Sequence, residues 1–202
     1  MKTMIKAILA CDDYGGVSKN GTLPWPNNST DLKWFKENTA GHIVVMGSTT
    51  WEDPGMPRPL PKRTNVIATT RPAEYPGADK YISGDLNLSV MRLSEEYPSL
   101  ITWVIGGPNI IEQTLGVIDE FYLSRIPGAY ACDTFLPLKK IESGSKIVIQ
   151  ESSASTHPLS SVKEVSTIEC EPAPKKPLNN SSPAATSGYP VGRERPGRRR
   201  AK

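Results

Sequence analysis

A single carboxyl group, that of Asp31, has sequence neighbours that could give it a chemical role. It stands at the start of an expected helix over residues 31–38, shortly after Leu23-Pro24-Trp25. Leu32 and Phe35 follow one and four residues later, so the three side chains share one helix face. A carboxyl group among apolar and aromatic side chains can have a tuned pKa and can bind a flat, nitrogen-rich ring. The alternative is that Asp31 only complements the helix dipole in the first turn.

Two glycine turns could bind an anion. Gly47 follows an apolar run and leads directly into residues 48–52, and Gly106-Gly107 leads into Pro108, which suits a first helical position. The free N–H groups at the start of a helix suit a phosphate. For the turn at Gly47, ordinary helix capping is the alternative.

The elements around these residues follow from short apolar runs separated by polar turns. Ser29 and Thr30 are good N-cap residues and predict that the helix bearing Asp31 begins there. Three- and four-residue steps predict a scaffold helix over residues 86–97. Strands are expected at residues 5–11, 42–46, 65–69, 81–82, 101–105 and 121–126, with a closing antiparallel pair at 146–151 and 162–170. This alternation predicts an α/β fold with a mostly parallel central sheet, an antiparallel C-terminal edge and flanking helices.

Composition excludes several classes of protein. The chain has 202 residues and a mean hydropathy of −0.38, and no apolar run reaches the length of a transmembrane helix. The three cysteines and two histidines are scattered, which argues against a disulfide framework and against a metal site. A reducing cytoplasm is therefore the expected location.

The positive charge is concentrated at the C-terminal end. Residues 172–202 contain eight lysines and arginines against Glu194, a balance of +7, so the net +3 leaves −4 for residues 1–171. Proline, serine and arginine dominate this segment, and its hydrophobic periodicity is lost. It is predicted to be a disordered basic tail after one folded domain at residues 1–171. Nonspecific contact with nucleic acid and an extension without a role are both open for it.

The ordered motifs resemble those of the dihydrofolate reductase family. They are Gly21 to Trp25, Asp31 to Lys36, Val44 to Gly47 with Thr50 to Glu52, Arg58 to Pro61 with Arg63, Val104 to Gly107, and Asp133-Thr134. Each is weak alone, but their joint order across roughly residues 4–170 is specific. The resemblance implies the three-layer sandwich of that family. It also implies NADPH-dependent reduction of 7,8-dihydrofolate to tetrahydrofolate, which supplies one-carbon carriers for thymidylate and purine synthesis.

The resemblance also implies the substrate site. Its catalytic residues would be Asp31, Trp25 and Leu23. Asp31 would accept two N–H bonds from the pterin and help it to be protonated, directly or through a water held by Trp25. Ser124 would link the acid to the pterin amino group, and Arg63 would bind the α-carboxylate of the substrate. The apolar walls would be Ile8, Leu9, Ala10, Leu32, Phe35, Leu60 and Ile105.

On the cofactor side, the resemblance implies Ala10 and four binding segments, at residues 17–23, 47–50, 68–71 and 106–113, with a mobile lid over residues 15–23. The Gly106-Gly107 peptide is expected to be cis. Ser48 and Asn109 stand where bacterial members commonly have arginines. The residues implied are Ala10, Val17, Ser18, Asn20, Gly21, Thr22, Leu23, Gly47, Ser48, Thr49, Thr50, Thr69, Thr70, Arg71, Ile105, Gly106, Gly107, Pro108, Asn109, Ile110 and Gln113.

Partners follow from the same resemblance. They are dihydrofolate and antifolates such as methotrexate or trimethoprim, with no metal and no membrane, and the protein is expected to be a monomer. Two rival functions stay open: a reductase of the riboflavin pathway that shares the fold, and an assembly protein that has lost turnover. The pairing of Trp25 with Asp31, together with Arg63, argues against the first rival.

Removal of residues 172–202 is expected to change neither thermal stability nor reductase activity. The segment has too few apolar residues for burial to offset the entropy lost on ordering. A thermal melt and an NADPH-oxidation assay on the truncated chain test this. A clear drop in either quantity would show that the segment packs on the domain.

Overall fold

The structure is a computed structural model that describes residues 3–152 and 163–164. All of these residues belong to the compact unit Met1–Pro172. The predicted tail at residues 172–202 lies outside the described residues. No helix in the described part of the chain is both long enough and apolar enough to cross a membrane.

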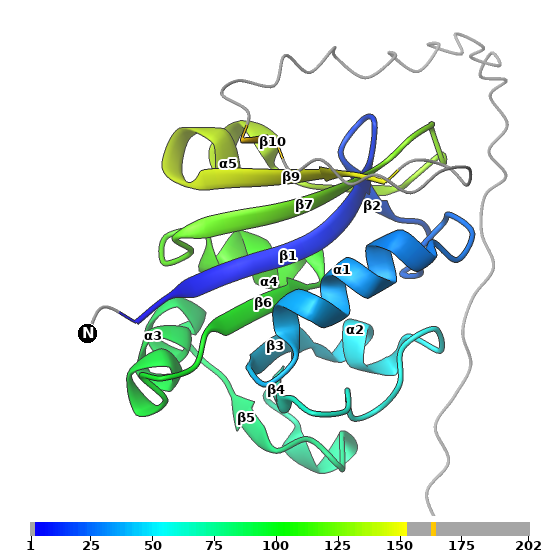
Figure 1. The fold of residues 1–202 in the computed structure, drawn as a ribbon. Coiled ribbons are helices and arrows are strands. Elements are labelled where there is room, and N and C mark those ends of the chain that lie inside the picture. The colour runs from blue at the N-terminus through cyan, green and yellow to red at the C-terminus, as the bar shows by residue number, and fades with distance from the viewer. Residues whose placement is uncertain (1–2, 153–162, 165–202) are drawn as a thin grey trace, which may run out of the picture. The chain divides into compact units, whose positions relative to one another are not determined.

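An eight-stranded sheet forms the centre of the unit (Figure 1), with the order β10-β9-β7-β1-β6-β3-β4-β5. Its pairings are parallel except that β10 is antiparallel to β9, which confirms the predicted sheet and its edge. Only 163–164 of the last predicted strand, 162–170, are described. The strands are β1 (Ile5–Asp12), β3 (Ile43–Gly47), β4 (Thr64–Ala68), β5 (Lys80–Ile82), β6 (Thr102–Gly106), β7 (Glu120–Ile126), β9 (Lys146–Glu151) and β10 (Lys163–Glu164).

Helices cover both faces of this sheet, because successive strand residues point to opposite sides. In β3, Ile43 and Val45 join one apolar cluster, whereas Val44 and Met46 join the other. Helices α3 (Leu86–Glu96) and α4 (Pro108–Thr114) contribute to the first cluster. Helices α1 (Ser29–Thr39) and α2 (Ser48–Glu52) contribute to the second. The three layers predicted from the family resemblance are therefore confirmed.

Several short elements were not predicted. Strands β2 (Gly16–Ser18) and β8 (Thr134–Phe135) pair with each other in a separate two-stranded sheet. Helix α5 (Leu138–Gly144) and the 3-10 turn η1 (Pro72–Glu74) are also additional. These elements are too short to carry a hydrophobic period, so the sequence pattern gives no signal for them.

The predicted N-cap of α1 was wrong by one or two residues. Asn28, not Ser29 or Thr30, caps the helix, and its side-chain oxygen accepts from the backbone N–H groups of Thr30 and Asp31, both at 3.1 Å. One amide oxygen satisfies two donors that the first turn leaves unpaired. The cap fixes Asp31 in the first turn of α1.

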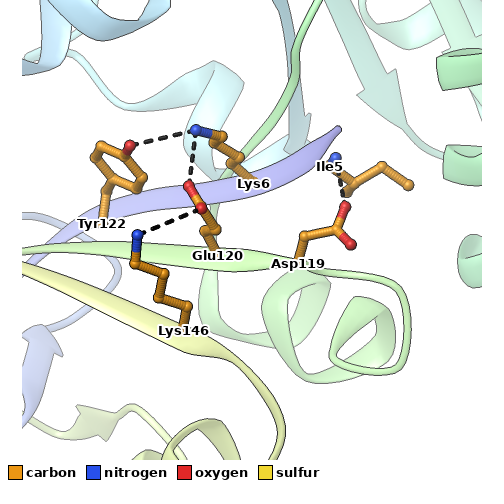
Figure 2. A network of polar contacts seen from close by, with 6 residues as sticks. All are labelled: Ile5, Lys6, Asp119, Glu120, Tyr122 and Lys146. Atoms are coloured by element: carbon orange, nitrogen blue, oxygen red, sulfur yellow. Dashed lines mark hydrogen bonds and ion pairs between the residues drawn. The ribbon is translucent and has the colours of Figure 1, made fainter. Parts of the chain in front are cut away.

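Helix α1 is held on the sheet by an aromatic contact. Trp34 stacks on Tyr122 of β7, with ring centroids 5.7 Å apart and planes inclined by 29°. Tyr122 in turn accepts a hydrogen bond from the Lys6 ammonium at 3.2 Å, and Lys6 pairs with Glu120 at 2.7 Å (Figure 2). Because Trp34 lies three residues after Asp31, this contact also fixes the orientation of the helix that carries the acid.

The strand order changes direction beside β1. Strand β6 lies between β1 and β3, although it follows both in sequence. Because these three strands are parallel, their carboxyl ends meet at one edge of the sheet. In open α/β sheets, ligands bind in the crevice at such a point. The fold therefore places the candidate site at this edge.

Candidate active site

A cavity of about 990 Å³ opens at this edge. Its walls include Ile8, Leu9 and Ala10 of β1, Gly47 at the end of β3, and Ile105 and Gly106 of β6. This volume is at the upper end of the range for small-molecule sites. The cavity brings together residues from the first third of the chain and from β6, far apart in sequence.

Asp31 is half-buried in one wall of this cavity. Burial disfavours its charged form and raises its pKa above the ordinary range, while a hydrogen bond with the Ser124 side chain partly opposes that rise. Ser124 is fully buried on β7, where it is in register with Ala10 of β1. The carboxyl group of Asp31 is therefore available to a ligand in the cavity.

The other two implied catalytic residues also line the cavity. Trp25 is buried and packs edge-to-face against Tyr130, with centroids 5.7 Å apart. Leu23 is 53 % exposed, as expected for a residue on a loop above the cavity.

The loop that contains Leu23 is anchored at two places. The carboxylate of Asp12 accepts the backbone N–H of Tyr14 at 2.9 Å and of Gly16 at 2.7 Å. Further along, the backbone N–H of Asn20 donates to the Asp133 carboxylate at 2.6 Å. Strands β2 and β8 pair between these points. The predicted lid is thus joined to the segment that follows β7, a connection that the sequence did not indicate.

Arg63 lies outside the cavity lining but is held in place. Its Nε donates to the Thr39 hydroxyl at 2.8 Å, and one terminal nitrogen donates to the Pro61 carbonyl at 3.1 Å. Its guanidinium carbon lies 5.4 Å from the centroid of the Phe35 ring, and Phe35 lines the cavity. The remaining N–H donors of this planar fork could bind a carboxylate.

The opposite part of the cavity is built from two helix starts. Gly47 and Gly107 are the N-caps of α2 and α4, and neither helix start is capped by a side chain. A Cβ on Gly47 would meet Ile110 at 3.0 Å, so this position favours glycine. Backbone N–H groups left free at such starts fit the phosphates of a dinucleotide. The Gly106–Gly107 peptide is cis, which confirms the expectation.

Most of the residues implied by the resemblance line this one cavity. Those that do are Ile8, Leu9, Ala10, Val17, Ser18, Gly21, Thr22, Leu23, Trp25, Asp31, Leu32, Phe35, Gly47, Ser48, Thr49, Thr50, Ile105, Gly106, Gly107, Pro108, Asn109 and Ile110. Those outside the lining are Asn20, Leu60, Arg63, Thr69, Thr70, Arg71, Gln113 and Ser124.

The sequence missed part of the lining. Asn27, Asp53, Pro54, Gly55, Met56, Thr134 and Leu136 also line the cavity. Ala68 and Ile111 line it too, and both lie within implied cofactor segments, 68–71 and 106–113. Asn27 lies within the stretch between Trp25 and Asp31, and residues 53–56 directly follow α2. Their closeness in sequence to implied residues was the available signal. Thr134 belongs to the Asp133-Thr134 motif, for which no site role was implied, and no comparable signal exists for Leu136.

Metal binding has no obvious place in the described part of the chain. Within residues 3–152 and 163–164, no group of three or more His, Cys, Asp or Glu side chains is arranged to hold a metal ion.

Comparison with known proteins identifies the family. Residues 4–162 match the model of the dihydrofolate reductase family. The dihydrofolate reductase of Bacillus subtilis is 34% identical over 151 residues, which are 73% of this chain and 83% of that protein. The enzyme of Haemophilus influenzae is 35% identical over 121 residues, 60% of this chain and 71% of that protein. A solved structure of dihydrofolate reductase from Enterococcus faecalis, complexed with NADP(H) and RAB-propyl, matches with a TM-score of 0.56 and 31% identity. The match covers 66% of this chain and 77% of that one.

Proposed function

The chain belongs to the dihydrofolate reductase family and reduces dihydrofolate to tetrahydrofolate with NADPH, and we propose that Asp31 binds the pterin ring and supports its protonation. The observation that carries this proposal is the position of Asp31. It is half-buried in the cavity wall, and this burial raises its pKa. An ionised carboxylate there can accept two parallel N–H bonds from the amino group and ring nitrogen of a pterin.

The raised pKa gives Asp31 its second role. Because burial disfavours the carboxylate, the group holds a proton to higher pH than an exposed aspartate does. It can then support proton delivery to the bound ring, directly or through a water beside Trp25. The apolar side chains of Ile8 and Phe35 exclude bulk water from the same wall. Dihydrofolate reduction needs one proton and one hydride, and this wall is suited to the proton.

NADPH supplies the hydride when it is bound. The residues that would hold it are the lid positions 17–23, the turn at 47–50, residues 69–71 and the turn at 106–110. The lid and the two turns all reach the cavity that contains Asp31. Their task is to align the two rings, because alignment alone can lower the barrier substantially.

Turnover with defined substrates tests this function. Purified protein should oxidise one NADPH per dihydrofolate reduced, and it should not oxidise NADPH with the pyrimidine substrate of the riboflavin-pathway reductases. Activity with the pyrimidine alone would favour the rival enzyme. Activity with neither substrate would favour a protein that has kept the fold without turnover.

Replacing Arg71 with alanine should weaken the binding of NADPH far more than the binding of NADH. Ser48 cannot form an ion pair with a 2′-phosphate, so we propose that Arg71, with Thr70, supplies this contact. In the structure Arg71 is exposed and pairs with Glu74 at 2.8 Å, so its side chain can exchange that partner for a ligand. Loss of one hydrogen bond to the charged phosphate should cost about 1.5–3 kcal/mol of NADPH binding free energy. Dissociation constants of both cofactors, measured by fluorescence titration, give the result.

The matched control is Arg92→Ala, which removes an exposed arginine from α3. This variant should bind both cofactors as the wild-type protein does. Equal losses of NADPH and NADH affinity in Arg71→Ala would mean that the phosphate is held elsewhere.

We further propose that the protein is a cytoplasmic monomer and binds antifolates such as methotrexate or trimethoprim at the Asp31 wall. The three cysteines, Cys11, Cys132 and Cys170, are scattered along the sequence, which suits a reducing compartment. Flat diamino-substituted rings can pair with the Asp31 carboxylate as a pterin does.

A further inference from the structure

One buried carboxylate joins the base of the lid to the segment that follows β7. Asp12, at the end of β1, is 3 % exposed, and its two oxygens have different partners. Oδ1 accepts the backbone N–H groups of Tyr14 at 2.9 Å and of Gly16 at 2.7 Å, both in the loop after β1. Oδ2 accepts the backbone N–H of Tyr130 at 3.3 Å and the Cys132 thiol at 3.5 Å. The carboxylate is therefore a bridge with one oxygen on each segment.

The two segments touch directly beside this carboxylate. A Cβ on Gly16 would lie 2.5 Å from the Cβ and 2.6 Å from the Sγ of Cys132, so this close approach requires glycine. The same added carbon would lie 3.0 Å from Oδ1 of Asp12. The bridge is therefore packed as well as hydrogen-bonded.

Backbone bonds between the two segments continue from the bridge towards the lid. The N–H of Leu136 donates to the Gly15 carbonyl at 2.9 Å, and the N–H of Asp133 donates to the Ser18 carbonyl at 3.0 Å. Val17, between these bonds, is buried and lines the cavity. The pairing of the two segments thus sets where the lid base meets the cavity.

Burial of the carboxylate makes the lid base harder to open than the lid tip. A buried charge that loses its hydrogen bonds costs more free energy than an exposed one, because water does not replace them. Moving the lid base away from Tyr130 would leave Asp12 in that state. At the tip, Asn20 donates to the carboxylate of Asp133, which is exposed, so water can replace that bond.

We propose that Asp12 is a positioning residue for the lid, holding its base against the segment after β7 so that the cofactor stays covered during hydride transfer. Asp12 does not line the cavity, and it acts through the backbone of Gly16 and Tyr130. This inference rests on the proposed binding of NADPH under residues 17–23. It adds that the stability of the lid base sets the rate at which NADPH leaves the site.

Asp12→Asn breaks the bridge with little change of shape. Its side-chain oxygen can keep the bonds from Tyr14 and Gly16, whereas its NH₂ group cannot accept one from Tyr130. Because NADPH leaves when the lid is open, it should dissociate from the variant about 10-fold faster, the factor for one lost hydrogen bond to a charged group. Stopped-flow fluorescence with excess NADP⁺ as the trap measures this rate. Asp12→Ala, which also releases the turn at Tyr14, should show a larger increase.

Hydrogen exchange shows whether the lid base itself has loosened. The backbone amides of Leu136 and Asp133 do not bond to Asp12 but link the same two segments. They should exchange about 10-fold faster in Asp12→Asn than in the wild-type protein. In the wild-type protein, the amide of Tyr130 should exchange more slowly than that of Asn20, which bonds to an exposed carboxylate. This last comparison needs no variant, so it holds even if Asp12→Asn folds poorly.

Asp119→Asn is the matched control, because Asp119 also accepts a backbone N–H, that of Ile5 at 3.1 Å, at the opposite end of β1 (Figure 2). It should leave NADPH dissociation and the exchange of the bridging amides unchanged, even if the thermal midpoint falls. Unchanged dissociation or unchanged exchange in Asp12→Asn, or equal changes in Asp119→Asn, would overturn the role of Asp12. Wild-type exchange at Tyr130 as fast as at Asn20 would overturn it too. A wild-type protein that does not bind NADPH would instead overturn the proposed function, and the exchange measurements do not depend on that outcome.

Discussion

Replacing Arg63 with leucine is expected to raise the KM for dihydrofolate by about 10- to 150-fold with little change in kcat. The fold-change corresponds to about 1.5–3 kcal/mol for hydrogen bonds to a charged group. Arg63 already donates to Thr39 and to the Pro61 carbonyl, so its guanidinium is held beside Phe35 before any substrate arrives. The substrate carboxylate lies far from the reacting ring. Loss of its contact with Arg63 should therefore weaken binding of the ground state and of the transition state equally.

An analogue of the substrate gives this prediction its control. The pteroate form of dihydrofolate lacks the glutamate, so its KM should be the same in wild-type protein and in Arg63→Leu. Arg58→Leu removes an exposed arginine from the same loop and should leave both values unchanged. A loss in Arg63→Leu that is equal for both substrates would show that Arg63 supports the fold of the site and does not bind the carboxylate. A thermal melt separates that effect from general destabilisation.

The sheet could be predicted because its strands carry their own signal. Residues 43–46 are all buried, as a parallel strand covered on both faces requires, so a continuous apolar run identifies it. The start of α1 was harder to predict. Asn28, Ser29 and Thr30 are all good N-caps in a row, and only the position of the side-chain oxygen selects Asn28.

The missed parts of the site depend on contacts distant in sequence. Thr134 and Leu136 reach the cavity because β8 pairs with β2, and those strands have only two and three residues. Such a pairing has no hydrophobic period to detect. The contact of Ser152 with Ser124 likewise joins residues 28 positions apart, one on β7 and one directly after β9. Buried hydroxyls of this kind become visible only when the tertiary structure brings them together.

Asp31→Asn should slow hydride transfer by about 10²- to 10⁴-fold near neutral pH, the usual contribution of general acid assistance. Asparagine keeps the shape and can form hydrogen bonds, but it cannot ionise or mediate a proton. Its amide also presents a donor where the pterin N–H groups need an acceptor. Acid conditions should restore part of the rate, because solvent can then protonate the bound substrate.

The same substitution should change the pH dependence of stability. Because the pKa of Asp31 is raised in the folded protein, the folded state binds more protons than the unfolded state between the ordinary value of 3.8 and the raised one. Stability from this group is therefore present at low pH and is lost as pH rises through that window. Asp31→Asn should remove this loss. The difference in free energy of unfolding between the variant and the wild-type protein should therefore favour the variant more at neutral pH than at acid pH. If Asp31 only complements the helix dipole, the variant should instead lose about 0.3–1 kcal/mol of unfolding free energy at neutral pH and keep near-normal turnover.

Single-turnover hydride transfer, followed from acid to alkaline pH in the wild-type protein and in Asp31→Asn, tests the role of Asp31 most directly. In the wild-type protein we expect the rate to fall as pH rises through the raised pKa of Asp31. We expect the variant to be slow at neutral pH and to recover partly in acid. Near-wild-type rates for Asp31→Asn at neutral pH would contradict the assignment of Asp31 as the residue that supports protonation.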